Sequence, residues 1–165
     1  MNVVSGFVDG TWMEYPMTSS PNMSDFETGD ASQLSVFDEV DTIAQRKAST
    51  GDIDFSLPAR VIPDFENQGV WPQEIETIIG PRDRLLRAVN ALEDLDPDQT
   101  DRAARLAHIV SLAEKIFGRK EKAFVWLRLN NRTLGNKSPF DILHRESGAR
   151  MVEEALMRIS YGIPV

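Results

Sequence analysis

From residue 73 to residue 165, the apolar residues follow a regular spacing. They recur three or four positions apart, which places them on one helical face, and no stretch alternates apolar with polar residues as a half-buried strand does. Breakers divide this part into expected helices at 73–79, 82–95, 97–117, 120–129 and 139–145, with a last helix ended by Gly162. In the second of these, the buried stripe is expected to consist of Leu85, Leu86, Val89, Leu92 and Leu95. The spacing therefore predicts an all-α body of five or six short helices.

Two of the helix starts carry a specific capping signal. Asp96-Pro97-Asp98-Gln99 and Ser138-Pro139-Phe140-Asp141 each combine a capping residue, a proline at the first helical position and a polar residue three positions after the cap. In such a pair, each side chain accepts a hydrogen bond from the other residue's backbone N–H. We therefore expect helices to begin at the two prolines.

The first third of the chain has a different character. Residues 1–33 contain several glycines and prolines and little periodicity, which predicts an irregular arm, although the arm also holds aromatic side chains. One short helix is expected over 34–48, followed by an irregular linker over 49–72. Residues 1–66 carry twelve acidic and three basic side chains. This acidic arm suits either a solubilising tail or a basic protein surface, and it packs either on a partner or second subunit or on its own domain.

The chain lacks the residue sets that most enzymes need. It has no cysteine, which excludes a disulfide framework, a thiol nucleophile and a cysteine-ligated zinc site. His108 lies within an apolar helix and His144 near a helix end, and neither has a partner acid at a suitable spacing. We expect a non-enzymatic protein without a metal or cofactor. The lack of a leader-like start and of an apolar run long enough to span a membrane favours a cytoplasmic location.

A group of arginines in the middle of the chain raises the alternative of DNA binding. The candidate contacts are Arg82, Arg84 and Arg87, in a region whose helices could form a helix-turn-helix. Neutralising phosphates supplies most of the affinity for DNA. Six acidic residues between positions 83 and 101 oppose the arginines, which argues against strong DNA binding by the isolated chain.

The C-terminal section is basic and has a distinctive end. Residues 115–165 hold ten basic and five acidic side chains. The chain closes with Arg158-Ile159-Ser160-Tyr161-Gly162-Ile163-Pro164-Val165. Tyrosine and arginine are the residue types that anchor interfaces, and a short proline-containing end loses little entropy on docking. This end is suited to insertion into a cleft, and the alternative is an ordinary frayed terminus.

An ordered series of short motifs lies in the last part of the chain. It comprises Trp126-Leu127, Leu134-Gly135, the run Pro139-Phe140-Asp141-Ile142-Leu143, Gly148 with Val152, and Arg158-Ile159 followed by Tyr161-Gly162. As a set, these motifs resemble the toxin-binding domain of the Xre/MbcA/ParS antitoxin family. The run from Leu85 to Ala107 resembles the Xre-like helical part of the same proteins. The resemblance covers about residues 70–165 and leaves the acidic arm outside.

The resemblance implies a type II antitoxin that is not itself an enzyme. Its partner would be a RES-domain toxin that uses NAD, either degrading it or transferring ADP-ribose, and the antitoxin would cover the toxin's NAD cleft. The family also implies a homodimer that carries toxins on its flanks. The toxin-facing positions carried over are Arg158, Tyr161, Gly162, Ile163, Pro164 and Val165. The positions that would shape the domain are Trp126, Leu134, Gly135, Pro139, Leu143, Gly148 and Val152.

These inferences combine into one expected organisation. Residues 1–69 would form the acidic arm and linker, 70–118 an Xre-like helical segment, and 119–165 the toxin-binding domain. The alternative function is that of a DNA-binding transcriptional regulator acting on its own operon.

Overall fold

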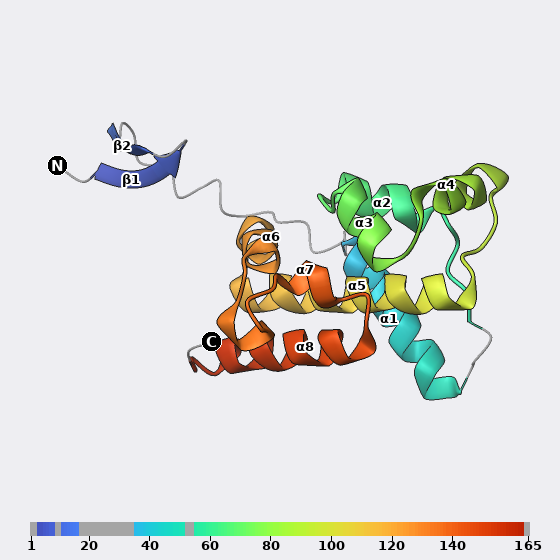
Figure 1. The fold of residues 1–165 in the computed structure, drawn as a ribbon. Coiled ribbons are helices and arrows are strands. Elements are labelled where there is room, and N and C mark those ends of the chain that lie inside the picture. Colours follow the sequence, from blue (N-terminus) through green and yellow to red (C-terminus); the bar gives the residue numbers. More distant parts are fainter. Residues whose placement is uncertain (1–2, 9–10, 17–34, 52–54, 164–165) are drawn as a thin grey trace, which may run out of the picture. The chain divides into compact units, whose positions relative to one another are not determined.

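The structure, a computed structural model, describes residues 3–8, 11–16, 35–51 and 55–163 (Figure 1). It consists of two units, residues 1–33 and 34–165, which are described separately. The strands are β1 (Val3–Val8) and β2 (Thr11–Pro16). The helices are α1 (Val36–Thr50), α2 (Val61–Asn67), α3 (Pro72–Ile78), α4 (Arg82–Ala91), α5 (Pro97–Phe117), α6 (Lys120–Arg128), the short 3-10 helix η1 (Arg132–Leu134), α7 (Pro139–Ile142) and α8 (Glu146–Ser160).

The first unit contains a β-hairpin. Strands β1 and β2 pair antiparallel, with Val3 opposite Pro16 and Val8 opposite Thr11. The prediction of an irregular arm was therefore wrong for these residues. The two positions between the strands in the sequence are Asp9 and Gly10, and this dipeptide is a strong signal for a two-residue hairpin loop.

The second unit is all-α, as predicted, and is organised around α5. Helices α1, α6 and α8 all contact α5, and α8 runs along it in Figure 1. Apolar residues on α5 recur at helical spacing, so that Leu106, Ile109 and Val110 are almost completely buried. The neighbouring helices contribute to the same core, for example through Leu127 of α6 and Leu156 of α8.

The segment expected to be an arm and linker up to residue 69 belongs largely to this helical unit. Phe37 of α1 stacks on Phe65 of α2 with ring centroids 5.1 Å apart, and both side chains are fully buried. Leu57, in the expected linker, is also buried, and its carbonyl accepts a hydrogen bond from the Leu95 N–H at 2.8 Å. Helix α2 lies within the expected irregular linker, and it contains a proline, Pro63, a residue that disfavours the interior of a helix. Pro63 lies in the first turn of α2, where a missing backbone N–H costs no helical hydrogen bond.

Helix α4 ends earlier than the apolar spacing suggested. It stops at Ala91, and Leu92 takes a left-handed conformation with φ 56°. Leu92 is 91% exposed and Leu86 is 40% exposed, whereas Leu85 and Leu95 are buried. The predicted buried stripe was therefore wrong at Leu92 and Leu86. Leu92 lies beyond the end of the helix, and Leu86 lies within α4 but on its exposed side, next to the buried Leu85.

Both predicted capping signals start helices. At α5, the Asp96 carboxylate accepts a hydrogen bond from the Gln99 N–H at 2.8 Å. At α7, the Ser138 hydroxyl accepts one from the Asp141 N–H, and the Asp141 carboxylate accepts one from the Ser138 N–H at 3.1 Å. Helix α7 is nevertheless shorter than expected and ends at Ile142.

The start of α8 lies unusually close to α7. Gly148, in the first turn of α8, is buried, and a Cβ atom added to it would lie 2.0 Å from the Ile142 carbonyl oxygen. This distance is far inside van der Waals contact. Only glycine therefore fits at this position without moving one helix away from the other.

Candidate functional site

The C-terminal end of α8 is exposed and has a defined course. The Gly162 N–H donates to the Ile159 carbonyl and the Ile163 N–H to the Arg158 carbonyl, both at 2.9 Å. Gly162 adopts φ 71°, the left-handed conformation in which glycine is favoured. These features form a Schellman turn, so the chain leaves the helix in a direction set by its backbone. The predicted contact position Gly162 therefore has a conformational role in the turn.

The side chains around this turn point to solvent. Tyr161 is 79% exposed and Ile163 is 46% exposed, and Arg158 is also exposed. The remaining predicted contact residues, Pro164 and Val165, lie outside the described residues. The structure thus brings together Arg158, Tyr161 and Ile163 at one exposed end, where they are accessible to a partner.

A groove runs between α8 and the loop that contains η1, and we call it the α8 groove. It consists of two cavities of about 80 and 260 Å³ that share Leu134 and Met151 in their walls. The other lining residues are Thr133, Gly135, Lys137, Ile142, His144, Arg145, Ser147, Gly148, Glu154, Ala155 and Arg158. The groove ends at Arg158, next to the exposed C-terminal turn.

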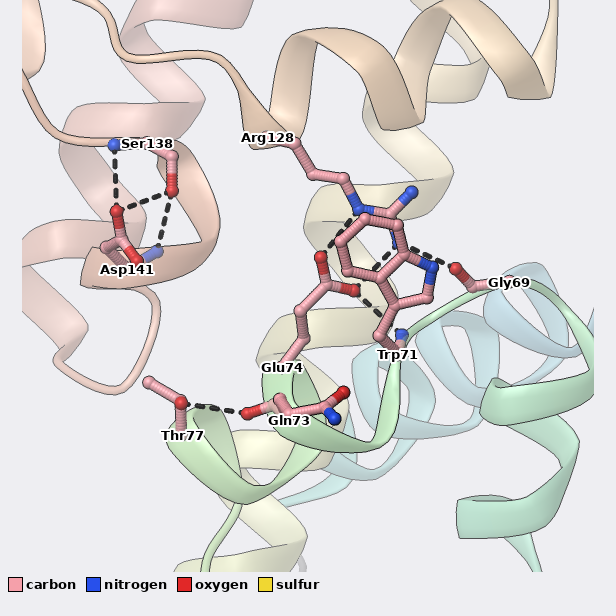
Figure 2. Close-up of polar contacts among 8 residues, drawn as sticks. All are labelled: Gly69, Trp71, Gln73, Glu74, Thr77, Arg128, Ser138 and Asp141. Carbon is pink, nitrogen blue, oxygen red and sulfur yellow. Dashed lines mark hydrogen bonds and ion pairs between the residues drawn. The ribbon is translucent and has the colours of Figure 1, made fainter.

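A compact polar cluster joins α6 to α3 (Figure 2). Arg128 donates from Nε to Glu74 Oε1 at 2.6 Å and from Nη2 to Glu74 Oε2 at 2.8 Å. It also donates to the Gly69 carbonyl at 2.8 Å and lies 3.8 Å from the centre of the Trp71 ring. The backbone N–H of Trp71 donates to the same Glu74 carboxylate. A bidentate arginine–carboxylate pair of this kind holds its two elements in a fixed relation.

The Arg128 pair gives a testable stability prediction. Replacing Arg128 by methionine keeps the unbranched apolar stem of the side chain but removes the guanidinium group, which leaves the mostly buried Glu74 carboxylate without its cation. We expect the free energy of unfolding to fall by about 2 kcal/mol, the range for hydrogen bonds to charged groups. Urea denaturation followed by circular dichroism measures the change. The control is Arg150→Met, because Arg150 forms only an exposed pair within α8 and its loss should cost little.

The two histidines have different surroundings: His108 lies near two carboxylates, whereas His144 lies at a helix end, as its position in the sequence suggested. His108 Nδ1 lies 3.0 Å from Asp41 Oδ1 of α1, and its Nε2 lies 3.6 Å from Glu153 Oε1 of α8. Spacing in the sequence does not reveal these two carboxylates, because both are far from His108 along the chain. His144 contacts the Asp141 carbonyl at the end of α7 through Nδ1 at 2.9 Å. No cluster of three potential metal ligands occurs among the described residues.

Asp38 of α1 and Glu114 of α5 have carboxyl groups whose pKa values depart from the ordinary ones. Burial alone would raise the pKa of Asp38, but hydrogen bonds from Ser111 and Lys115 lower it below its ordinary value. Burial raises the pKa of Glu114, and its Oε1 has no hydrogen-bond partner among the described residues. Asp38 is thus a stable anion that fixes the start of α1 on α5, whereas the charge of Glu114 is poorly compensated.

The candidate DNA-contacting arginines lie on α4. Arg82 pairs with Glu66 at 2.8 Å, and Arg87 Nε donates to the carbonyl of Asp83. Arg84 and Arg87 are exposed and lie three residues apart, which places them on one side of the helix. The ion pair of Arg82 reduces its value as a phosphate contact, so two of the three arginines remain available for DNA.

The positions expected to shape the domain lie in its interior or at turns. Leu134, Leu143 and Val152 are buried, as are Pro139 and Gly148. Trp126 is half-buried, and its ring centre lies 5.8 Å from that of Phe117. Gly135 caps η1 with φ 68°. These contacts give each position a role in packing or backbone conformation.

Comparison with known proteins places the chain in a family. A family model for the antitoxin Xre/MbcA/ParS C-terminal toxin-binding domain matches residues 112–162. The antitoxin Xre of Pseudomonas putida is 30% identical over 118 residues, which is 66% of this chain and 74% of that protein. The antitoxin Xre of Photorhabdus laumondii is 30% identical over 110 residues, 65% of this chain and 74% of that protein. The antitoxin Xre of Yersinia enterocolitica is 32% identical over 68 residues, 41% of this chain and 46% of that protein.

The matched region contains the surface described above. Residues 112–162 include α6, η1, α7 and α8, together with the α8 groove and most of the exposed C-terminal turn. Among the described residues, no helix has the length and apolar character needed to cross a membrane. On the identity and coverage of the Pseudomonas putida relative, supported by the family model, this chain belongs to the Xre/MbcA/ParS family of antitoxins.

Proposed function

We propose that this antitoxin belongs to a type II system and neutralises a RES-domain toxin that uses NAD, by occluding the toxin's active-site cleft. The observation that supports this proposal is the exposed C-terminal end of α8, within and just beyond the family's toxin-binding domain. The toxin would either degrade NAD or transfer ADP-ribose to a target. The antitoxin itself would carry out no reaction and need no cofactor.

The shape and chemistry of the C-terminal end support insertion into a cleft. Tyr161 and Ile163 project from a Schellman turn, and Arg158 lies one helical turn before Tyr161. A large aromatic side chain beside a cation is a common anchor in protein interfaces. Because the turn is already formed, little backbone freedom would be lost on binding. The contact set proposed from the sequence also includes Pro164 and Val165.

The assembly we propose is a homodimer of the antitoxin that carries toxin molecules on its flanks. Exposed apolar side chains outside the C-terminal end, such as Trp71 and Val125, permit association but do not specify it. Sedimentation of the purified chain with and without toxin measures the stoichiometry directly.

The test of the toxin proposal uses the purified chain and the toxin encoded by the neighbouring reading frame. We expect a stable complex in calorimetry and suppression of the toxin's NAD consumption when the antitoxin is in excess. NAD loss and ADP-ribosylation are both assayed, so that the two reactions are distinguished. A toxin that binds this chain but consumes NAD at its full rate would contradict occlusion, and a partner without NAD-dependent activity would contradict the RES assignment.

DNA binding is the second candidate function, and the exposed pair Arg84 and Arg87 on α4 is the observation that favours it. Under this alternative, the purified chain binds a duplex from its own promoter in a salt-dependent manner. Arg87→Ala is then expected to weaken binding severalfold in a gel-shift titration, because one phosphate contact is lost. The paired Arg82 is the matched comparison, and Arg82→Ala should have the smaller effect. No shift of the duplex at low salt would remove this function.

A further inference from the structure

We propose that the α8 groove binds an acidic, partly apolar segment of the toxin, as a second contact beside the C-terminal end of α8. This inference rests on the proposed function, because it assumes that the partner is the toxin. The α8 groove is a surface separate from the toxin-facing positions expected from the sequence. Of its lining residues, only Arg158 is among those positions.

The charge of the groove indicates an acidic occupant. Lys137, Arg145 and Arg158 line it, and none of the three has an ion-pair partner among the described residues. Glu154 is the one carboxylate among the lining residues. Cations left without intramolecular partners around a concavity favour an incoming segment that supplies carboxylates.

Apolar side chains line the groove together with its cations. Met151 lies at the junction of the two cavities and is 46% exposed, although it belongs to a helix whose inner face is fully packed. Leu134 and Ile142 line the same concavity. Methionine is flexible and polarizable, so it fits irregular partner surfaces. An occupant with both apolar and acidic side chains therefore matches the groove better than a fully charged one.

The position of the groove makes contact with the toxin a geometric consequence of the proposed function. Arg158 forms part of the groove wall and lies three residues before Tyr161, in the exposed end. A protein that encloses Tyr161 and Ile163 would lie beside Arg158, which is one helical turn away and belongs to the groove wall. All lining residues fall within the segment matched by the toxin-binding domain. A contact that begins at the C-terminal end thus continues naturally into the groove.

The test is a double charge reversal, Lys137→Glu with Arg145→Glu. Both side chains are exposed, and a glutamate at the N-terminus of α8 is favourable to the helix, so folding is expected to be unchanged. The control is Arg119→Glu with Lys122→Glu, which changes the net charge equally at two exposed positions, the N-cap and the first turn of α6. Circular dichroism and thermal unfolding verify both variants. Binding of each to the purified toxin is measured by calorimetry and stopped-flow association at low and physiological salt.

We expect the groove variant to raise the Kd for the toxin by about tenfold or more at low salt, with a slower association rate and a weaker salt dependence than the wild type. The control variant should stay within about threefold of the wild type. Equal affinities of the groove variant and wild type, or equal weakening by the groove and control variants, would overturn the inference. So would a groove variant that binds toxin normally but loses binding to a promoter duplex, since the cations would then serve DNA.

Failure of the proposed function gives a different pattern. If the wild-type chain neither binds nor inhibits the toxin, the proposed function fails, and the inference fails with it. If the wild type binds, and substitution of the C-terminal end weakens binding while groove reversal does not, then only the inference about the groove is wrong.

Discussion

Replacing Tyr161 and Ile163 together by alanine is expected to abolish most of the inhibition of the toxin while leaving the antitoxin folded. Tyr161 is 79% exposed and Ile163 is 46% exposed in the free protein, so the fold gains little from them. Tyrosine anchors in protein interfaces contribute about 2 kcal/mol or more, which corresponds to about a thirtyfold loss of affinity. Calorimetry with the purified toxin measures the affinity, and the rate of NAD loss measures inhibition.

The matched control for this prediction is Leu92→Ala. Leu92 is also a large apolar side chain, it is 91% exposed, and it lies at the end of α4 outside the toxin-binding domain. Its replacement should leave both affinity and inhibition unchanged. An alanine pair at Tyr161 and Ile163 that still inhibits the toxin as the wild type does would disprove insertion of the C-terminal end. If the alanine variant binds the toxin normally but no longer inhibits it, the C-terminal end serves to occlude the toxin's cleft and does not contribute to affinity.

The second large effect is expected for Gly148→Ala, which should reduce the free energy of unfolding by about 3 kcal/mol or more. The new methyl carbon would lie 2.0 Å from the Ile142 carbonyl oxygen, and backbone at such a contact cannot rotate away as a side chain can. Inserting a methyl group into a packed site costs about 1–3 kcal/mol, and occasionally more where the surroundings cannot yield. Helix α8 must therefore move away from α7, which also displaces the α8 groove.

The stability of Gly148→Ala is measured by urea denaturation, and its toxin affinity by calorimetry. The neighbouring variant Ser147→Ala is the control, since Ser147 is exposed and alanine suits the first turn of a helix. We expect Ser147→Ala to stay within about 0.5 kcal/mol of the wild type. A Gly148→Ala protein as stable as this control would show that α7 and α8 can separate without cost. The close approach would then have no importance for the fold.

Local signals predicted the helical unit well. The capping boxes at Asp96 and Ser138 fixed the starts of α5 and α7, because these signals depend on residues only three positions apart. Glycines in a left-handed conformation likewise end α5 at Gly118. The hairpin of β1 and β2 was a different case. Its Asp-Gly signal was present in the sequence, but the surrounding breakers were given more weight.

The long-range side-chain pairs could not have been predicted from spacing. Glu74 and Arg128 are separated by 54 positions, and Asp41 and His108 by 67. Which charged residues meet depends on how the helices pack, and helix packing is not encoded in local periodicity. The same limit explains why the packing of Leu57 and Phe65 into the core was missed. Their segment is too short and too rich in prolines to show a helical stripe.

The exposure of Arg158 and Tyr161 follows from the helix stop at Gly162, which the sequence displays directly, whereas their contact with the toxin stays a prediction. The α8 groove does not follow in this way, because its cations come from the loop after η1, from the start of α8 and from its end. These positions are scattered in sequence, and only the turn of the chain between η1 and α8 brings them to one concavity.

The clustering of aromatic rings around Phe124 has a practical consequence for anyone exchanging parts between related antitoxins. Phe124 of α6 contacts Phe37 with ring centroids 6.3 Å apart, and α6 also depends on Glu74 through Arg128. A fragment consisting of residues 112–162 would lack Phe37 and Glu74, the partners of Phe124 and Arg128. We therefore expect that it does not fold alone. Chimeras that transfer toxin preference from one antitoxin to another have to exchange the whole block that begins at residue 34.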